Sequence, residues 1–166
     1  IESRGLGDVY KRQKLLSYHD HSNVSKINYF LKLLKEGASM AIISDAGTPL
    51  ISDPGYELVA KAIDEKIKVT SIPGPSAVIS ALISSGLSTS SFVFEGYAPK
   101  KKGQLETFLK NLQYEMRTII LFESPKRIER LVEMIAKILG PKRKVSLAKE
   151  LTKKFERVIT DEAKDC

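Results

Sequence analysis

The chain has 166 residues, enough for one domain or two small ones, and its 42% hydrophobic content is ample for a packed core. No run approaches the roughly 18 uninterrupted apolar residues of a membrane span, and no secretory leader opens the chain, so we expect a cytoplasmic protein without a membrane partner. The only cysteine, Cys166, excludes an internal disulfide and a multi-cysteine metal site. The net charge of +7 suits a polyanionic partner, although solubility explains many basic surfaces.

The first helix is predicted after an unpatterned start. Residues 1–13 show no helical or strand period, and we interpret them as a leader outside the domain. Apolar side chains such as Ile27, Phe30 and Leu34 then follow the 3.6 period of a helix, which Gly37 ends.

Two histidines, His19 and His21, precede this helix. A metal site would need a third and a fourth ligand, and the chain has no other histidine. We therefore favour a loop or lid over a metal site, and no metal is expected.

A candidate ligand loop follows the apolar run at residues 40–43. The run predicts a strand, and the small and polar residues 44–49 lie where open α/β sheets bind ligands. Gly47 would let a ligand approach the backbone, and Pro49 would fix the turn. An ordinary strand-to-helix connection fits these residues equally well.

The following helix is expected at residues 56–65, with Asp53 as its N-cap and Pro54 at its first position. A second strand, at residues 67–72, ends in a second small-residue turn, at residues 73–76.

That second turn opens a helix at residues 77–82. Two such turns after consecutive strands predict neighbouring loops at one edge of a parallel sheet. The helix N-termini there would offer backbone N–H groups to a carboxylate or a phosphate.

The rest of the chain alternates strands and helices. A strand is expected at residues 91–95, and the shift in composition at residues 97–103 predicts a linker between two domains. Beyond it we expect a helix at 104–112 and a strand at 118–122. An amphipathic helix follows, capped by Ser124 and Pro125 and ended by Gly140 and Pro141. A strand at 145–148 and an uncompleted element in 155–166 complete the pattern.

Five motifs in this order resemble one known family. They are SDAGTPLISDPGY at residues 44–56, IPGPSA at 72–77, FEGY at 94–97, ESP at 123–125 and KELTK at 149–153. From about Lys14 to Val158, the chain resembles the bacterial 16S ribosomal RNA (cytidine-2'-O)-methyltransferases of the tetrapyrrole methylase superfamily.

The resemblance implies a tetrapyrrole-methylase-like fold of two α/β domains with S-adenosylmethionine in the cleft between them. The remainder of a cofactor domain would occupy residues 14–96, and an incomplete second domain residues 104–166. The family normally begins with a strand and a Pro-x-Gly-Asn loop and then carries a Glu-Asp-Thr-Arg segment, and this sequence has neither. We therefore expect a fold truncated at both ends.

The resemblance also implies cofactor contacts, residue by residue. The first two turns and the crossing between the domains supply them: Asp45, Gly47, Thr48, Pro49, Ile51, Ser76, Ala77, Phe94, Gly96 and Tyr97.

Transfer of a methyl group to a ribose hydroxyl requires positioning and removal of the hydroxyl proton. The candidates for taking that proton are Glu123, Lys149 and Glu150, each of which also fits an ordinary surface ion pair, and the missing Glu-Asp-Thr-Arg segment is an equally good location.

Basic clusters would neutralise the phosphates of small-subunit (16S) ribosomal RNA. The expected RNA contacts are Lys100, Lys101, Lys102, Arg127 and Arg130, whereas residues 142–144 also suit the solvation of a helix end. Three functions stay open: an RNA ribose methyltransferase, which is the favoured one and a possible homodimer; a tetrapyrrole methylase of the corrinoid or siroheme type; and an inactive fragment that binds RNA.

Overall fold

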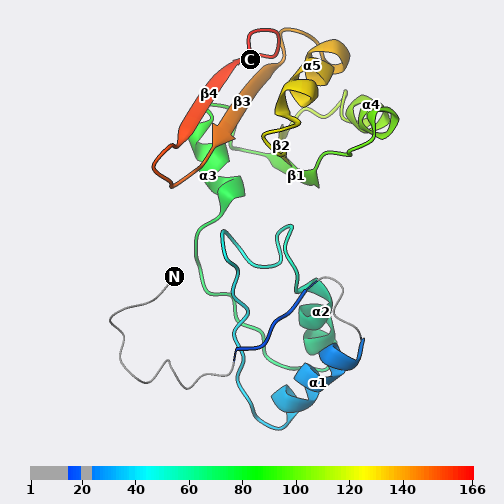
Figure 1. Ribbon diagram of the computed structural model, residues 1–166, viewed down its shortest axis with the longest axis vertical. Helices are drawn as coiled ribbons and strands as arrows, with labels where there is room; N and C mark the ends of the chain where they lie inside the picture. The colour runs from blue at the N-terminus through cyan, green and yellow to red at the C-terminus, as the bar shows by residue number, and fades with distance from the viewer. Residues whose placement is uncertain (1–14, 20–23) are drawn as a thin grey trace. The chain divides into compact units, whose positions relative to one another are not determined.

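The computed structural model describes residues 15–19 and 24–166, and the chain divides into two compact units. The first contains the described residues up to Ser44 together with residues 49–72, and the second contains residues 45–48 and 73–166 (Figure 1). The expected leader at residues 1–13 and His21 lie outside the described residues. Within the described ranges, no helix has the length and hydropathy that a membrane span requires.

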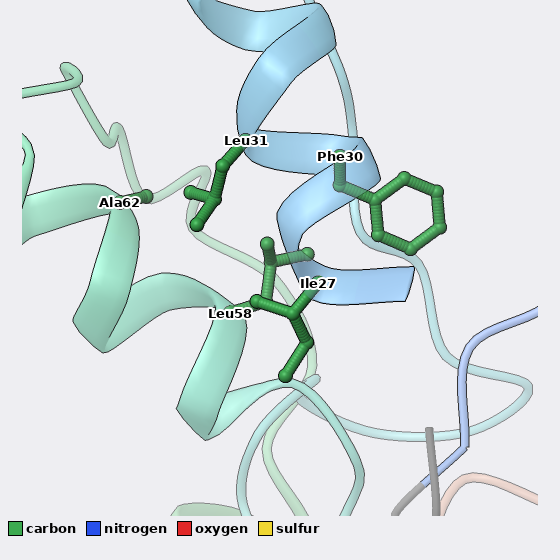
Figure 2. Close-up of a cluster of buried hydrophobic side chains, with 5 residues drawn as sticks. All are labelled: Ile27, Phe30, Leu31, Leu58 and Ala62. Atoms are coloured by element: carbon green, nitrogen blue, oxygen red, sulfur yellow. The ribbon is translucent and has the colours of Figure 1, made fainter. Parts of the chain in front are cut away.

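The first unit is built on two helices, α1 (Val24–Lys35) and α2 (Tyr56–Asp64). Figure 2 shows Ile27 and Leu31 of α1 directed toward α2, whereas the Phe30 ring lies on the side of α1 away from α2. The predicted first helix is confirmed, and Gly37 follows it with φ 95°. The buried cluster consists of Ile27, Phe30, Leu31, Leu58 and Ala62.

The prediction of strands at residues 40–43 and 67–72 is wrong, because both segments are irregular. Ile43 is 78% exposed and Ile72 is 85% exposed. A strand forms when its backbone groups pair with a neighbouring strand, and within the described ranges every paired strand lies beyond residue 91. An apolar run alone does not supply that partner.

The expected N-cap of α2 is also wrong. The N-cap is Gly55 rather than Asp53, and no side chain caps the helix. Gly55 has φ 134°, which is outside the helical range, so Pro54 does not begin the helix.

The second unit contains a parallel pair of strands, β1 (Phe92–Tyr97) and β2 (Thr118–Phe122), in which Phe94 lies opposite Ile120. Helix α3 (Ala77–Ser84) packs against this pair, because Val78 and Leu82 are buried with Ile120. The expected strand at 118–122 and the expected helix after residues 73–76 are both confirmed.

Helices α4 (Lys102–Asn111) and α5 (Ile128–Leu139) form the main core of the second unit. Their buried side chains include Leu109, which is fully buried, and Leu131. Gly140 ends α5 with φ 107°, as the Gly-Pro pair predicts. The predicted linker at residues 97–103 includes the end of β1 and the start of α4, within the second unit, and its role as a domain boundary stays a prediction.

The chain closes with an antiparallel hairpin, β3 (Lys144–Lys149) and β4 (Arg157–Glu162), with Leu147 opposite Ile159. The expectation of an uncompleted element at residues 155–166 is therefore wrong, because β4 pairs along its whole length with β3. Thr160 ties the hairpin to the residues after α3, since its Oγ1 donates to the Ser85 carbonyl oxygen at 2.7 Å.

Replacing Leu109 with alanine is expected to lower the free energy of unfolding by about 2 to 5 kcal/mol, because the cavity left in a well-packed core is only partly refilled. Lys110→Ala at the adjacent exposed position breaks only the surface ion pair with Glu106, so a loss of about 0.5 kcal/mol or less is expected. Denaturant unfolding followed by circular dichroism measures both. Equal losses in the two variants would contradict the assignment of Leu109 to the core.

Candidate functional site

A cavity of about 430 Å³ lies within the second unit, and small residues dominate one of its walls. Ala46 and Gly47 contribute to it from the first turn, and Pro75, Ser76 and Ala77 from the second. The other lining residues come from α3, from β2 and from the β3–β4 hairpin with its loop. These further lining residues include Ser80, Ala81, Ile120, Phe122, Glu150, Leu151, Thr152 and Lys153.

One hydrogen bond connects the two turns. The Thr48 Oγ1 atom donates to the carbonyl oxygen of Pro75 at 2.7 Å. The sequence prediction that these loops are neighbours agrees with this contact, although the strands expected to bring them together are absent from the described residues. Gly47 has φ 72°, and no atom lies within 4 Å of where its Cβ would be, so this backbone faces open space.

The second turn gives the cavity hydrogen-bond donors. Ser76 is the N-cap of α3, and its Oγ accepts the N–H of Ile79 at 3.4 Å. In the part of the chain that the structure describes, Ala77 and Val78 keep N–H groups that the helix does not pair. Such a helix start suits a carboxylate, and the cavity volume falls in the usual range for small ligands, about 300 to 1,000 Å³.

The other predicted cofactor residues lie elsewhere. Asp45 is exposed and belongs to the second unit, whereas Pro49 and Ile51 belong to the first unit. On β1, Phe94 packs its ring against Phe122 at a centroid distance of 4.9 Å.

Two more of these residues lie at the end of β1. The Tyr97 ring packs on Phe122 at 5.6 Å. Gly96 has φ 67° and lies where the register with β2 shifts. Neither these two residues nor Phe94 line the cavity.

Sequence reasoning missed several lining residues. Ser80 and Ala81 lie one helical turn after Ser76 and Ala77, so the 3.6-residue period of the predicted helix would have found them. Leu151 and Thr152 reach the cavity through the hairpin loop, and no local pattern signals this.

The three predicted catalytic residues, Glu123, Lys149 and Glu150, line a second cavity of about 830 Å³ in the same unit. Glu150 lines both cavities. Lys149 and Glu150 are exposed, whereas the side chain of Glu123 is only 4% exposed.

Glu123 is held by an ion pair with Arg127. The Arg127 Nη2 atom lies 2.5 Å from Glu123 Oε1, which also accepts the backbone N–H of Ser124 at 2.6 Å. Arg127 Nε donates to Ser124 Oγ at 3.3 Å, and its buried Nη1 has no partner among the described residues. Arg127, an expected RNA contact, is thus engaged with the β2–α5 turn.

The expected cap of α5 by Ser124 and Pro125 is wrong. The N-cap is Arg127, with no side-chain cap, and its N–H donates to the Ser124 carbonyl oxygen in a turn that precedes the helix.

The remaining expected RNA contacts are solvent-exposed. Lys100, Lys101 and Lys102 lie at the start of α4, where Lys101 is the N-cap, and Arg130 lies on α5.

Comparison with known proteins gives one family. A sequence model described as "Tetrapyrrole (Corrin/Porphyrin) Methylases" matches residues 7–166. Its match includes residues 7–13, which carry no motif that we identified.

Three relatives are named "Ribosomal RNA small subunit methyltransferase I". The Mesorhizobium japonicum protein is 45% identical over 95% of this chain and 54% of its own length. The Synechocystis sp. protein is 46% identical, covering 86% of this chain and 51% of its own length. The Mycobacterium tuberculosis protein is 42% identical, covering 92% and 53%. This chain spans about half the length of the relatives it matches.

A solved structure supports the fold. The crystal structure of the methyltransferase CobJ superimposes with a TM-score of 0.62, covering 86% of this chain and 64% of that chain, at 18% sequence identity. At that identity the likeness concerns the fold alone, and it agrees with the predicted α/β architecture of the tetrapyrrole methylase type.

Replacing Arg127 with methionine leaves the nearly buried Glu123 carboxylate without its counter-ion. We expect a loss of about 2 to 4 kcal/mol in the free energy of unfolding, and Glu123→Gln added to this variant should restore more than half of it. Arg130→Met, on the exposed face of α5, is the control, with an expected change within about 0.5 kcal/mol. Denaturant unfolding measures all three variants. If Arg127→Met and Arg130→Met behave alike, the ion pair does not stabilise this turn.

Proposed function

We propose, on the premise that this chain belongs to the tetrapyrrole (corrin/porphyrin) methylase family, that its protein transfers a methyl group from S-adenosylmethionine to a ribose 2'-hydroxyl of small-subunit (16S) ribosomal RNA. One observation carries the proposal: the two turns expected to hold the methyl donor line one cavity and are joined by the Thr48–Pro75 hydrogen bond. The printed names of the relatives support the RNA substrate.

The residues around the smaller cavity fit the methyl donor. The free N–H groups at the start of α3 would bind its carboxylate, and Gly47 would let its body lie against the backbone. When bound, S-adenosylmethionine supplies an activated methyl group on a sulfonium, so the chain's own work is positioning and proton removal.

Glu150 is the best-placed group in this chain to accept the hydroxyl proton. It is exposed and lines both cavities, whereas the Glu123 carboxylate is occupied by Arg127 and by the Ser124 N–H. We assign Glu123 to positioning the β2–α5 turn. Lys149, which lines only the larger cavity, would act on the RNA rather than on the proton.

In this proposal the exposed lysines at the start of α4 contact phosphates of the RNA. The proposal also includes a cytoplasmic location and a homodimer. A small-molecule tetrapyrrole methylase is the alternative within the same family. Its substrate would not require the run of cations at residues 100–102.

Purified full-length protein and the 166-residue chain are tested separately with radiolabelled S-adenosylmethionine and either undermethylated small ribosomal subunits or a tetrapyrrole, which decides between these functions. Label should enter the ribose of the rRNA with the full-length protein. Label on a tetrapyrrole and none on the subunits would overturn the proposal.

Gly47→Ala is expected to weaken S-adenosylmethionine binding about tenfold, because the added Cβ projects into the open space of the cavity. Gly86→Ala is a matched control: Gly86 also has a left-handed φ, 68°, with open space around its Cβ, but it does not line the cavity. Calorimetric titration measures the affinity, and thermal unfolding should show a similar loss of stability in both variants. Equal affinity in the two variants would remove Gly47 from the cofactor site.

Reversing the charges of Lys100, Lys101 and Lys102 to glutamate should weaken RNA binding and leave the affinity for S-adenosylmethionine unchanged. The slope of log Kd against log salt concentration should fall by about 2 if all three contact phosphates of single-stranded RNA. Unchanged RNA affinity, with an unchanged salt slope, would count against these contacts.

A further inference from the structure

The loop of the β3–β4 hairpin, residues 150–156, has features that the proposed methyl transfer does not use. It lies at the end of the hairpin opposite the C-terminus of the chain (Figure 1). Its first part, Glu150 to Lys153, lines the smaller cavity. Its second part, from Lys154 to Glu156, is exposed to solvent.

The loop and its flanks carry an excess of positive charge. Residues 149–157 contain four basic and two acidic side chains. One of the two acidic groups, the Glu156 carboxylate, accepts the backbone N–H of Thr152. Within the described ranges, no ion pair engages the basic side chains, which are Lys149, Lys153, Lys154 and Arg157.

Phe155 is a solvent-exposed aromatic residue beside these basic side chains. Its side chain is 70% exposed and belongs to none of the buried clusters of the described residues. The Lys154 Nζ atom lies 5.6 Å from the centroid of its ring. An exposed aromatic ring among unpaired cations can stack on a base while the cations contact the adjacent phosphates.

The backbone of the loop is already ordered. The Lys153 N–H donates to the Glu150 carbonyl oxygen at 3.0 Å, and the Glu156 N–H donates to the Lys153 carbonyl oxygen at 3.1 Å. Glu150 and Thr152 have φ of 51° and 65°, a conformation that residues with a Cβ adopt at some cost. A loop held in this shape loses little conformational entropy when it binds a ligand.

We propose that this loop binds single-stranded RNA, with Phe155 stacked on an unpaired base and Lys153, Lys154 and Arg157 contacting the neighbouring phosphates. This inference rests on the proposed function and names the RNA-binding element of the same site. A polyanion is favoured over a protein partner, because lysine is depleted from protein interfaces whereas the loop is rich in lysine.

The test uses full-length protein and a fluorescently labelled single-stranded RNA of about ten nucleotides, the range of a single-strand site. Phe155→Ala should weaken binding about fivefold or more without changing its salt dependence, and Phe155→Tyr should bind nearly as the wild type. The double variant Lys154→Gln with Arg157→Gln, at two residues that do not line the smaller cavity, should lower the slope of log Kd against log salt by about 1.4. Unchanged affinity for S-adenosylmethionine establishes that each variant folds.

Tyr114→Ala is the matched control. Tyr114 is also a strongly exposed aromatic residue, at 85%, in the turn between α4 and β2, and its removal should leave RNA affinity unchanged.

Each outcome separates this inference from the proposed function. If the wild-type protein binds the RNA but Phe155→Ala binds as well as Tyr114→Ala does, the loop inference fails and the methyltransferase proposal stands. If the loop variants lose affinity for intact small subunits and keep it for the oligonucleotide, the loop contacts a ribosomal protein, which also contradicts the inference. If the wild-type protein methylates only a tetrapyrrole and binds no RNA, both fail.

Discussion

The hydrogen bond from Thr48 to the Pro75 carbonyl oxygen is the contact on which the candidate site depends. It joins residues 27 positions apart in the sequence, at 2.7 Å. Residues 45–48 belong to the second unit although the residues before and after them belong to the first, so this short loop is held by its own contacts. The positive φ of Gly47 turns the loop, and the Ser76 cap orders the facing helix start. The wall of the smaller cavity is therefore made by two loops that the sequence places far apart.

Periodic segments were predictable, because their signal is local. The apolar stripe of α5 and the strand at residues 118–122 follow from residues that are close in sequence. The segments at residues 40–43 and 67–72 are as apolar as strands, but a strand also needs a partner, which a local pattern does not reveal. The hairpin strand β4 was missed for the converse reason: its polar sequence forms a strand because β3 lies beside it.

The candidate site also combines residues that a local sequence pattern predicts with features that no local pattern reveals. Gly47, Ser76 and Ala77 carry signals of their own, since glycine and a serine before a helix each imply a backbone geometry. No local sequence pattern shows whether a charged side chain is buried. The sequence allows an ion pair at Glu123 but predicts one on the surface, whereas the structure shows the Arg127 ion pair with a Glu123 side chain that is only 4% exposed. A general base must be free to accept a proton, so this contact supports Glu150 over Glu123 in the proposed mechanism.

The hairpin loop connects the cavity proposed for the methyl donor with the aromatic residue proposed to bind RNA, over a short length of chain. Glu150 lines the smaller cavity, and Phe155 is exposed five residues later. Even a fully extended chain covers at most about 18 Å in that distance. A base stacked on Phe155 would therefore keep its strand close to the methyl donor. Methyl transfer depends on holding the hydroxyl near the donor, and a loop that lines the cavity and binds the RNA strand would provide such a constraint with few residues.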